Sequence, residues 1–345
     1  MSYPKSPVLK GPKRHHFLPR MYLKGFCQDE LLAVFDRETG LIKRQTIENT
    51  GLQGHLYTYE DESGRRRFDI EALLSKIESD LSHAICKFED GSKFTAAEIG
   101  HLISFVAFAE LRTPDALDQT AQVYASFVRT TAKVVASSKQ RAASTLASMY
   151  RDRGEIRSNE EIQAEAERLV DFVKKDDYSI KVDKQMALMQ NMKLWVKVAH
   201  ALEKKNIRFV RTTDDNSRYL TCDSPVILES RTSEMVGFES PSSMVFFPLT
   251  SKCLVVFSGS DRFTGSGTAN EKQVDNVNEL IALNTDRYLI GPDEAALARI
   301  TDRLGIARTQ RGPKYETSHL PTGDGAISVV RRVLPHRTKP KDIGT

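Results

Sequence analysis

The sequence predicts an α+β fold in which a helical middle section packs on a mixed, mainly antiparallel sheet. From Asp69 to about residue 204, apolar residues recur with a period near 3.6, which is typical of amphipathic helices. Short runs rich in β-branched and aromatic residues precede this stretch, and further such runs, separated by turn residues, follow it from Asn206. No internal repeat is visible. A small N-terminal β element, a helical middle and a mixed C-terminal part together indicate the α+β class.

The N-terminal part contains one short helix and one hairpin. Pro19 is suited to begin a helix that reaches about Phe26, because its missing N–H would be unpaired in the first turn anyway. Residues 32–35 form an apolar run that ends in the turn sequence Asp-Arg-Glu-Thr-Gly, and residues 41–46 can pair with it.

The helical middle begins with an apolar stripe at Ile70, Leu73, Leu74, Ile77, Leu81 and Ile85. Thr95 and Glu98 form a capping box that opens a helix apolar nearly all round, so we expect that helix at the centre of the core. Arg112-Thr113-Pro114 ends it. Further helices are predicted to about Tyr150, then over residues 159–174 and 179–204.

The C-terminal part is predicted to contain short strands over residues 207–211, 219–221, 226–228, 245–247 and 254–257. Gly259–Gly267 has the composition of a surface loop. Helices are expected over residues 270–283 and 293–304, with a strand at 287–290 between them and a last strand at 326–330.

One domain is expected over residues 13–332, between a flexible proline-containing arm at 1–12 and a basic tail at 333–345. Hydrophobic residues make up 40% of the 345 residues, which is enough for a sizeable core.

The net charge of +4 permits a nucleic-acid partner without requiring one. No signal-peptide pattern or membrane-spanning apolar run is present, so we expect a cytoplasmic protein with no membrane partner. The oligomeric state is left open.

The most informative stretch is His15-His16-Phe17-Leu18-Pro19-Arg20-Met21-Tyr22-Leu23-Lys24-Gly25-Phe26. Together with Leu111-Arg112-Thr113-Pro114, Thr221-Cys222-Asp223-Ser224-Pro225-Val226, Phe247-Pro248-Leu249-Thr250 and Asn278, it resembles the bacterial domain-of-unknown-function family numbered 4238. The resemblance covers about residues 13–292. The third motif usually has Ser-Asp-Asn-Pro where this chain has Cys222-Asp223-Ser224-Pro225, so the aspartate and proline are kept. The resemblance implies one domain and a shared site, with Asn278 among its residues, and it supplies no reaction.

His15 and His16 are the first candidate catalytic residues, because histidine changes charge near neutral pH and is a common metal ligand. In an extended stretch before Pro19 the two rings point to opposite sides, so only one is expected to reach a common site. The alternative is that both satisfy buried backbone groups.

Arg20, Tyr22 and Arg112 are candidate substrate-binding residues. Arg20 falls in the first turn of the short helix, where an anion could use the guanidinium and the helix end. A solvated arginine and a packed tyrosine are the alternative. Arg112 either stabilises a helix C-terminus or pairs with Asp223 or a substrate anion.

Asp223 is the third candidate catalytic residue, because one carboxylate fixed at a strand end can orient a histidine, accept a proton or bind a metal. The alternative is a turn in which the carboxylate bonds its own backbone. Glu71 and Glu78 share one helix face; a solvated face is the first interpretation, and a divalent metal held with His15 or His16 is the second. The cofactor is therefore undetermined.

Two classes of function follow from these residues. The first is a hydrolase of the nuclease or phosphodiesterase type, in which a histidine acts as base or metal ligand, Asp223 orients it, and Arg20 and Arg112 balance phosphate charge. The second is a non-catalytic module that binds an anionic ligand with the same residues. In both classes the partner is a nucleic acid or another phosphate-bearing ligand.

Overall fold

The computed structural model describes residues 8–90, 92, 95–214, 216–230, 237–259, 264–305, 315–322 and 325–332. The chain divides into two compact units. The first contains the described residues of Met1–Leu117 and Leu188–Gly312, and the second those of Asp118–Ala187 and Pro313–Val333. The expected single domain over 13–332 stays a prediction. Residues 1–7 of the expected arm and the whole basic tail at 333–345 lie outside the described residues.

The first unit holds most of the helices. They are α1 (Arg20–Lys24), α2 (Asp69–Ser82), α3 (Ile85–Asp90), α4 (Ala96–Leu111), α8 (Lys184–Glu203, whose first turn belongs to the second unit), α9 (Glu271–Asn284) and α10 (Glu294–Leu304), with a short 3₁₀ turn, η1 (Ile47–Asn49).

The strands of the first unit form two larger sheets and two short ribbons. They are β1 (Arg14–His16), β2 (Leu31–Asp36), β3 (Leu41–Thr46), β4 (Leu52–Gly54), β5 (Tyr59–Glu60), β6 (Arg66–Arg67), β7 (Asn206–Thr212), β8 (Thr221–Cys222), β9 (Ile227–Ser230), β10 (Ser243–Thr250), β11 (Cys253–Ser258), β12 (Thr264–Ala269) and β13 (Tyr288–Gly291).

The five-stranded sheet has the order β12-β7-β11-β10-β9 and is antiparallel except for the parallel pair of β12 and β7. The four-stranded sheet, β3-β2-β13-β8, is antiparallel throughout. β1 pairs with β4, and β5 with β6. This arrangement confirms the predicted α+β class, with a mixed and mainly antiparallel sheet.

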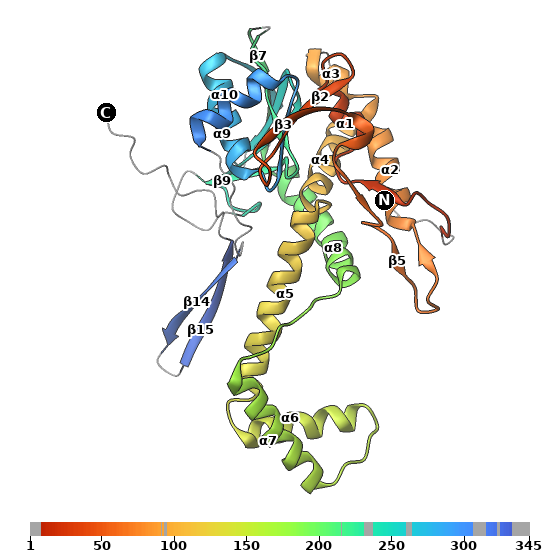
Figure 1. Ribbon diagram of the computed structural model, residues 1–345, viewed down its shortest axis with the longest axis vertical. Coiled ribbons are helices and arrows are strands. Elements are labelled where there is room, and N and C mark those ends of the chain that lie inside the picture. The colour runs from red at the N-terminus through yellow and green to blue at the C-terminus, as the bar shows by residue number, and fades with distance from the viewer. Residues whose placement is uncertain are drawn as a thin grey trace. The chain divides into compact units, whose positions relative to one another are not determined.

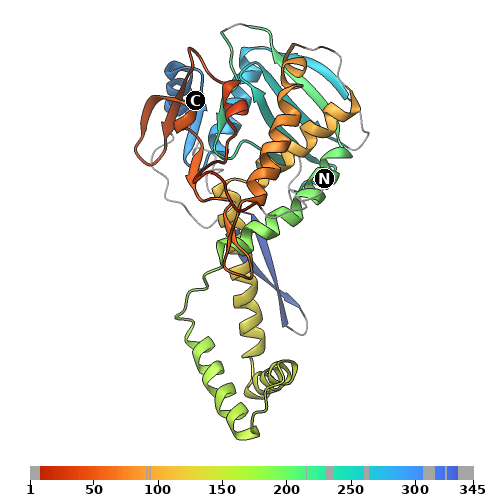
Figure 2. The same ribbon diagram turned by 90° about the vertical axis from the view of Figure 1, so that its right-hand side faces the viewer.

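One face of the five-stranded sheet packs on the N-terminal helices. Phe105 of α4 meets Phe247 of β10, and Phe88 of α3 stacks on Phe209 of β7 with ring centroids 5.0 Å apart. Figure 2 shows α2 and α4, in orange, lying across the strands of this sheet. These aromatic pairs form the centre of the core, where α4 was expected because its sequence is apolar nearly all round.

α9 lies between the two sheets. Its Val274 packs on the remaining face of the five-stranded sheet, while Ile281 and Ala282 pack on the four-stranded sheet. α10 lies beside α9 and against β2 and β3 (Figure 1). Because both helices bury apolar residues on the same small sheet, β2, β8 and β13 are held together although they come from distant parts of the chain.

The local signals at the ends of helices are confirmed. Thr95 accepts a hydrogen bond from the N–H of Glu98, whose carboxylate accepts one from the N–H of Thr95, so the predicted capping box is present. The expectation of a surface loop over Gly259–Gly267 is wrong from Thr264 onward, where the chain forms β12. Parallel pairing with β7 uses backbone groups, which glycine supplies as well as any residue.

The second unit contains α5 (Pro114–Val135), whose first turn belongs to the first unit, α6 (Lys139–Asp152), α7 (Asn159–Lys175) and the hairpin of β14 (Tyr315–Thr322) and β15 (Gly325–Arg332). Its core consists of small apolar residues: Ala136, Ala142, Ala143, Ala166, Val170 and Val173. Over the described residues, no helix of either unit is both long and apolar enough to cross a membrane.

Candidate functional site

The N-terminal signature is held in place by strand pairing and one short helix. β1 pairs with β4, with His15 opposite Gln53 and His16 opposite Leu52. Because side chains alternate along a strand, the two rings point to opposite sides, as the sequence predicted. His15 is fully buried, whereas His16 is half-buried.

His15 is held by backbone groups on both ring nitrogens. Its Nδ1 accepts the N–H of Tyr57 at 2.9 Å, so Nε2 carries the proton and donates to the carbonyl of Pro12 at 2.8 Å. The ring also stacks on Tyr57, with centroids 5.4 Å apart. This geometry satisfies buried backbone groups, so the catalytic role of His15 stays a prediction without further support.

His16 offers a nitrogen to the surface. Its Nδ1 lies 3.2 Å from the carbonyl of Thr50 and therefore carries the proton, while Nε2 accepts the Nε–H of Arg20 at 3.2 Å. Burial lowers the pKa of His16, and the charges of Arg20, Arg112 and Arg14 lower it further. His16 is consequently neutral at pH 7, with its basic nitrogen beside an exposed guanidinium.

Arg20 is the first residue of α1, a helix of only five residues. Its Nε donates to His16, and its terminal nitrogens form no hydrogen bond with a described residue, although its charge acts on the nearby Glu48 carboxylate. The guanidinium can therefore bind an external anion through its planar fork.

Arg112 is buried at the end of α4 and connects three elements. Its terminal nitrogens donate to Glu78 of α2 at 2.7 Å and to the backbone carbonyl of His16 at 2.6 Å, and its Nε donates to the hydroxyl of Tyr57. Burial disfavours its charge, but Tyr57 and Glu78 outweigh burial and raise its pKa. Arg112 thus positions His16 and does not pair with Asp223.

Glu71 and Tyr57 complete this cluster. Burial raises the pKa of Glu71 to about 7, the neighbouring Glu78 adds to the rise, and Arg112 opposes it. The Oε2 atom of Glu71 is buried without a hydrogen-bond partner among the described residues. The spacing of Glu71 and Glu78 predicted that they share one helix face, but nothing in the sequence indicated that this face contacts Arg112. Tyr57 has no sequence signal at all.

Tyr22 lies in the core and not beside His16. Its hydroxyl forms a 2.5 Å hydrogen bond with Thr221 of β8, and its ring stacks on Phe247. The side chain is 1% exposed, so it reaches no ligand in this conformation. Its observed contacts join α1 to both sheets.

Asp223 is held by the chain that leads into β13. Its carboxylate accepts the N–H groups of Asp286, Arg287 and Tyr288 at 2.9, 2.7 and 2.9 Å. Burial and the charge of Asp286 raise its pKa to about 7, against the three hydrogen bonds. Among the described residues, no hydrogen bond joins Asp223 to His15, His16, Arg20 or Arg112.

Asn278 of α9 is buried and bonds two backbone groups. Its Oδ1 accepts the N–H of Leu220 at 2.8 Å, and its Nδ2 donates to the carbonyl of Arg218 at 2.9 Å. Asn278 therefore fastens the segment before β8 to α9. The structure brings together His16, Arg20 and Arg112, with His15 behind them, and places Tyr22, Asp223 and Asn278 elsewhere.

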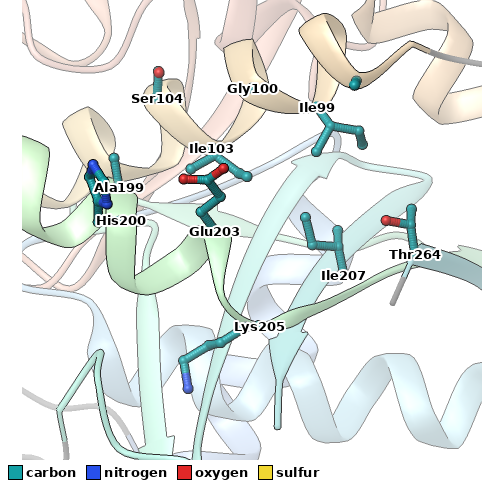
Figure 3. Close-up of a pocket in the computed structure, with 11 residues that line it drawn as sticks. Ile99, Gly100, Ile103, Ser104, Ala199, His200, Glu203, Lys205, Ile207 and Thr264 are labelled. Carbon is teal, nitrogen blue, oxygen red and sulfur yellow. The ribbon is translucent and has the colours of Figure 1, made fainter. Parts of the chain in front are cut away.

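A separate cavity of about 510 Å³ lies between α4, the end of α8, β7 and β12 (Figure 3). Its apolar wall includes Ile103 and Ile207, and its polar side chains include His200 and Glu203, which are exposed. Lys205 points away from this cavity, since its ammonium donates to the carbonyls of Ser240 and Ser243. The cavity contains none of the residues predicted for the site.

No group of three or more His, Cys, Asp or Glu side chains is placed to hold a metal ion in the described part of the chain. The expectation of a divalent metal accordingly stays a prediction.

Comparison with known proteins gives one match. The model of a family described as "Protein of unknown function (DUF4238)" matches residues 14–295, which contain every residue discussed above as a candidate. No curated protein and no solved structure matches the chain.

Proposed function

The chain belongs to the DUF4238 family, whose description names no activity, and we propose from the site around His16 that it is a hydrolase of the nuclease or phosphodiesterase type. In this proposal His16 accepts a proton from the attacking water or hydroxyl group. Arg20 binds the phosphate group, and Arg112 positions His16 through its backbone.

The observation that carries the proposal is the orientation of the His16 ring. The carbonyl of Thr50 holds the proton on Nδ1, so Nε2 is the acceptor nitrogen. In this structure its lone pair accepts the Nε–H of Arg20, and it becomes free for the substrate's proton when Arg20 turns to the phosphate group. A base must be unprotonated at working pH and lie within hydrogen-bond reach of the substrate's proton. His16 meets the first condition because its pKa is lowered. The second condition would be met when Arg20 binds the phosphate group of the substrate next to His16.

The charge around His16 supports an anionic ligand. Arg14, Arg20 and Arg112 all lower the pKa of His16 through their charge. Glu78 neutralises Arg112, whereas the terminal nitrogens of Arg20 form no hydrogen bond with a described residue and face only the longer-range charge of the exposed Glu48. Positive groups that are already in place favour the negative charge that develops on phosphate in the transition state.

The second candidate is a non-catalytic module that binds a phosphate-bearing ligand at the same residues. The position of Asp223 favours it, because this carboxylate is bonded to three backbone N–H groups and does not orient His16. A backbone carbonyl orients the ring without stabilising the imidazolium as strongly as a carboxylate does.

The test measures turnover and binding on the same full-length variants. Hydrolysis of bis(p-nitrophenyl) phosphate and of short single-stranded and duplex oligonucleotides is followed with Mg²⁺, with Mn²⁺ and with EDTA. We expect His16→Ala to lower the rate by about 10²- to 10⁴-fold, the usual contribution of a positioned base. The exposed His83, which bonds only within its own helix end, gives the matched control His83→Ala.

Binding separates the two candidates. For the hydrolase, Arg20→Ala should raise KM about tenfold or more, and binding should weaken as salt rises because neutralised phosphates release counterions. Binding of oligonucleotides that is sensitive to Arg20→Ala, without turnover, would favour the binding module. Absence of both binding and turnover at low salt would remove both candidates.

A further inference from the structure

The five-stranded sheet carries a second cleft, formed by residues between Asn206 and Val277, far in sequence from His16. It lies on the face that α9 covers only in part, and its volume is about 440 Å³. β7 contributes Arg208 and Val210, β10 Phe246, β11 Val256, and α9 Val277. A volume of this size suits a small ligand, since ligand pockets in proteins span about 300 to 1,000 Å³.

The register of the strands explains why the cleft exists. Val256 lies directly between Arg208 on β7 and Phe246 on β10, so these three side chains stand in one row on one face. On the other side of β7, the edge strand β12 places Gly265 opposite Arg208 and Gly267 opposite Val210. The row therefore continues onto two glycines of β12, which carry no side chain, and the sheet is hollow at that edge.

One charged group in the cleft has no partner in the described part of the structure. The guanidinium of Arg208 is exposed and forms no hydrogen bond or ion pair with another described residue. The guanidinium is therefore available to a carboxylate or phosphate group, which arginine binds through its planar fork.

We propose that this cleft binds a small amphipathic anion, with an apolar body on Val210, Val256 and Phe246 and one carboxylate or phosphate head on Arg208. The site is independent of the function proposed for His16.

The probes are decanoate and decyl phosphate, with decanol as the uncharged analogue, titrated calorimetrically against the full chain. Decanoate, decyl phosphate or both should bind, and decanol should bind at least about tenfold more weakly, because a charge-assisted hydrogen bond to arginine is lost. Arg208→Gln should remove this preference for the charged probes. Arg66→Gln, on the exposed strand β6, makes the same change in charge elsewhere and should leave binding unchanged.

Two further variants test the cleft itself. A Cβ at Gly267 would meet no atom within 4 Å, so Gly267→Leu fills the hollow edge without strain and should weaken binding at least about tenfold. Tyr219→Phe should leave binding unchanged, because the hydroxyl is buried away from the cleft, and should leave thermal stability unchanged or higher, because it removes an unpaired buried group. Arg20→Ala should have no effect, which separates this site from the His16 site.

Three results would overturn the proposal. They are no binding of either charged probe to the wild-type chain, equal binding of decanol and the charged probes, and unchanged binding by a correctly folded Gly267→Leu variant.

Discussion

Two neighbouring histidines of the same stretch have opposite surroundings. His15 is enclosed, with the N–H of Tyr57 on one nitrogen and the carbonyl of Pro12 on the other. His16 keeps one nitrogen toward Arg20. The difference follows from strand alternation in β1 and from which face of β1 the rest of the molecule covers. Identical residue types therefore support a structural role at one position and a chemical role at the next.

His15→Ala should destabilise the fold without involving the proposed chemistry. The change leaves the buried N–H of Tyr57 unpaired and removes a stacked ring, so the free energy of unfolding should fall by about 2 to 4 kcal/mol. Urea denaturation measures this loss. His83→Ala, an exposed control, should change it by less than about 0.5 kcal/mol. A His15→Ala variant as stable as wild type would contradict the structural role.

Glu71 should make the stability depend on pH. The unfolded carboxyl ionises near its ordinary pKa of 4.5, whereas the folded one holds its proton to about 7. The folded state thus binds more protons between these values, so stability declines as pH rises from 4.5 through 7. Glu71→Gln removes this loss and should stabilise the chain by about 1 to 2 kcal/mol more at pH 8 than at pH 4.5.

Urea denaturation at the two pH values measures the effect of Glu71→Gln, with Glu60→Gln on the exposed β5 as control. Equal stabilisation at both pH values would show that Glu71 does not titrate abnormally.

At the scale of elements, single polar side chains fasten distant segments. Arg112 joins the end of α4 to α2 and β1, Asn278 joins α9 to the segment before β8, and Asp223 holds the start of β13. Each is a polar residue in the core that bonds at least one distant backbone group. Their motifs therefore stand out in the sequence for structural reasons as well as for any chemical one.

The Asp223→Asn variant tests whether Asp223 has a structural or a catalytic role. An amide has one acceptor oxygen where the carboxylate has two, so one N–H among Asp286, Arg287 and Tyr288 loses its partner. We expect unfolding to become easier by about 1 to 3 kcal/mol, with the catalytic rate per folded molecule unchanged. Thermal denaturation and the hydrolysis assay together measure both quantities. Unchanged stability with lost turnover would instead restore Asp223 to the catalytic machinery.

At the scale of the whole molecule, the first unit is discontinuous in sequence. Its described residues come from before Leu117 and after Leu188, and β2 pairs with β13 across this interval. A cut anywhere within Asp118–Ala187 of the second unit therefore leaves each fragment with only part of the four-stranded sheet. Neither fragment can bury the apolar residues that the sheet and α9 share.

Limited proteolysis should accordingly nick the exposed connection at residues 153–158, between α6 and α7, without yielding separately stable pieces. The two fragments should elute together on size-exclusion chromatography in native buffer and lose their structure once separated in denaturant. Two fragments that refold on their own after a cut between about residues 150 and 180 would contradict a single cooperative domain.

The sequence by itself determined the local elements, because the signals for them are local. Apolar periodicity located α2, and the capping box at Thr95 located the start of α4. A helix was predicted at α9, and β2 and β3 were predicted as a hairpin. Strand alternation also separated His15 from His16 before the fold was known. β12 was missed because its glycine-rich residues carry no side-chain signal, and its hydrogen bonds depend on the presence of β7.

Only the tertiary structure decided which side chains meet. The sequence grouped His16, Arg20, Arg112 and Asp223, but strand pairing and helix packing brought Glu78 to Arg112 and took Asp223 to the start of β13. Burial is likewise a property of the assembled fold, and burial is what raises the pKa of Glu71 and leaves the hydroxyl of Tyr219 unpaired. The type of a residue determines which chemistry it can perform, whereas the fold determines how deeply it is buried and which groups lie beside it.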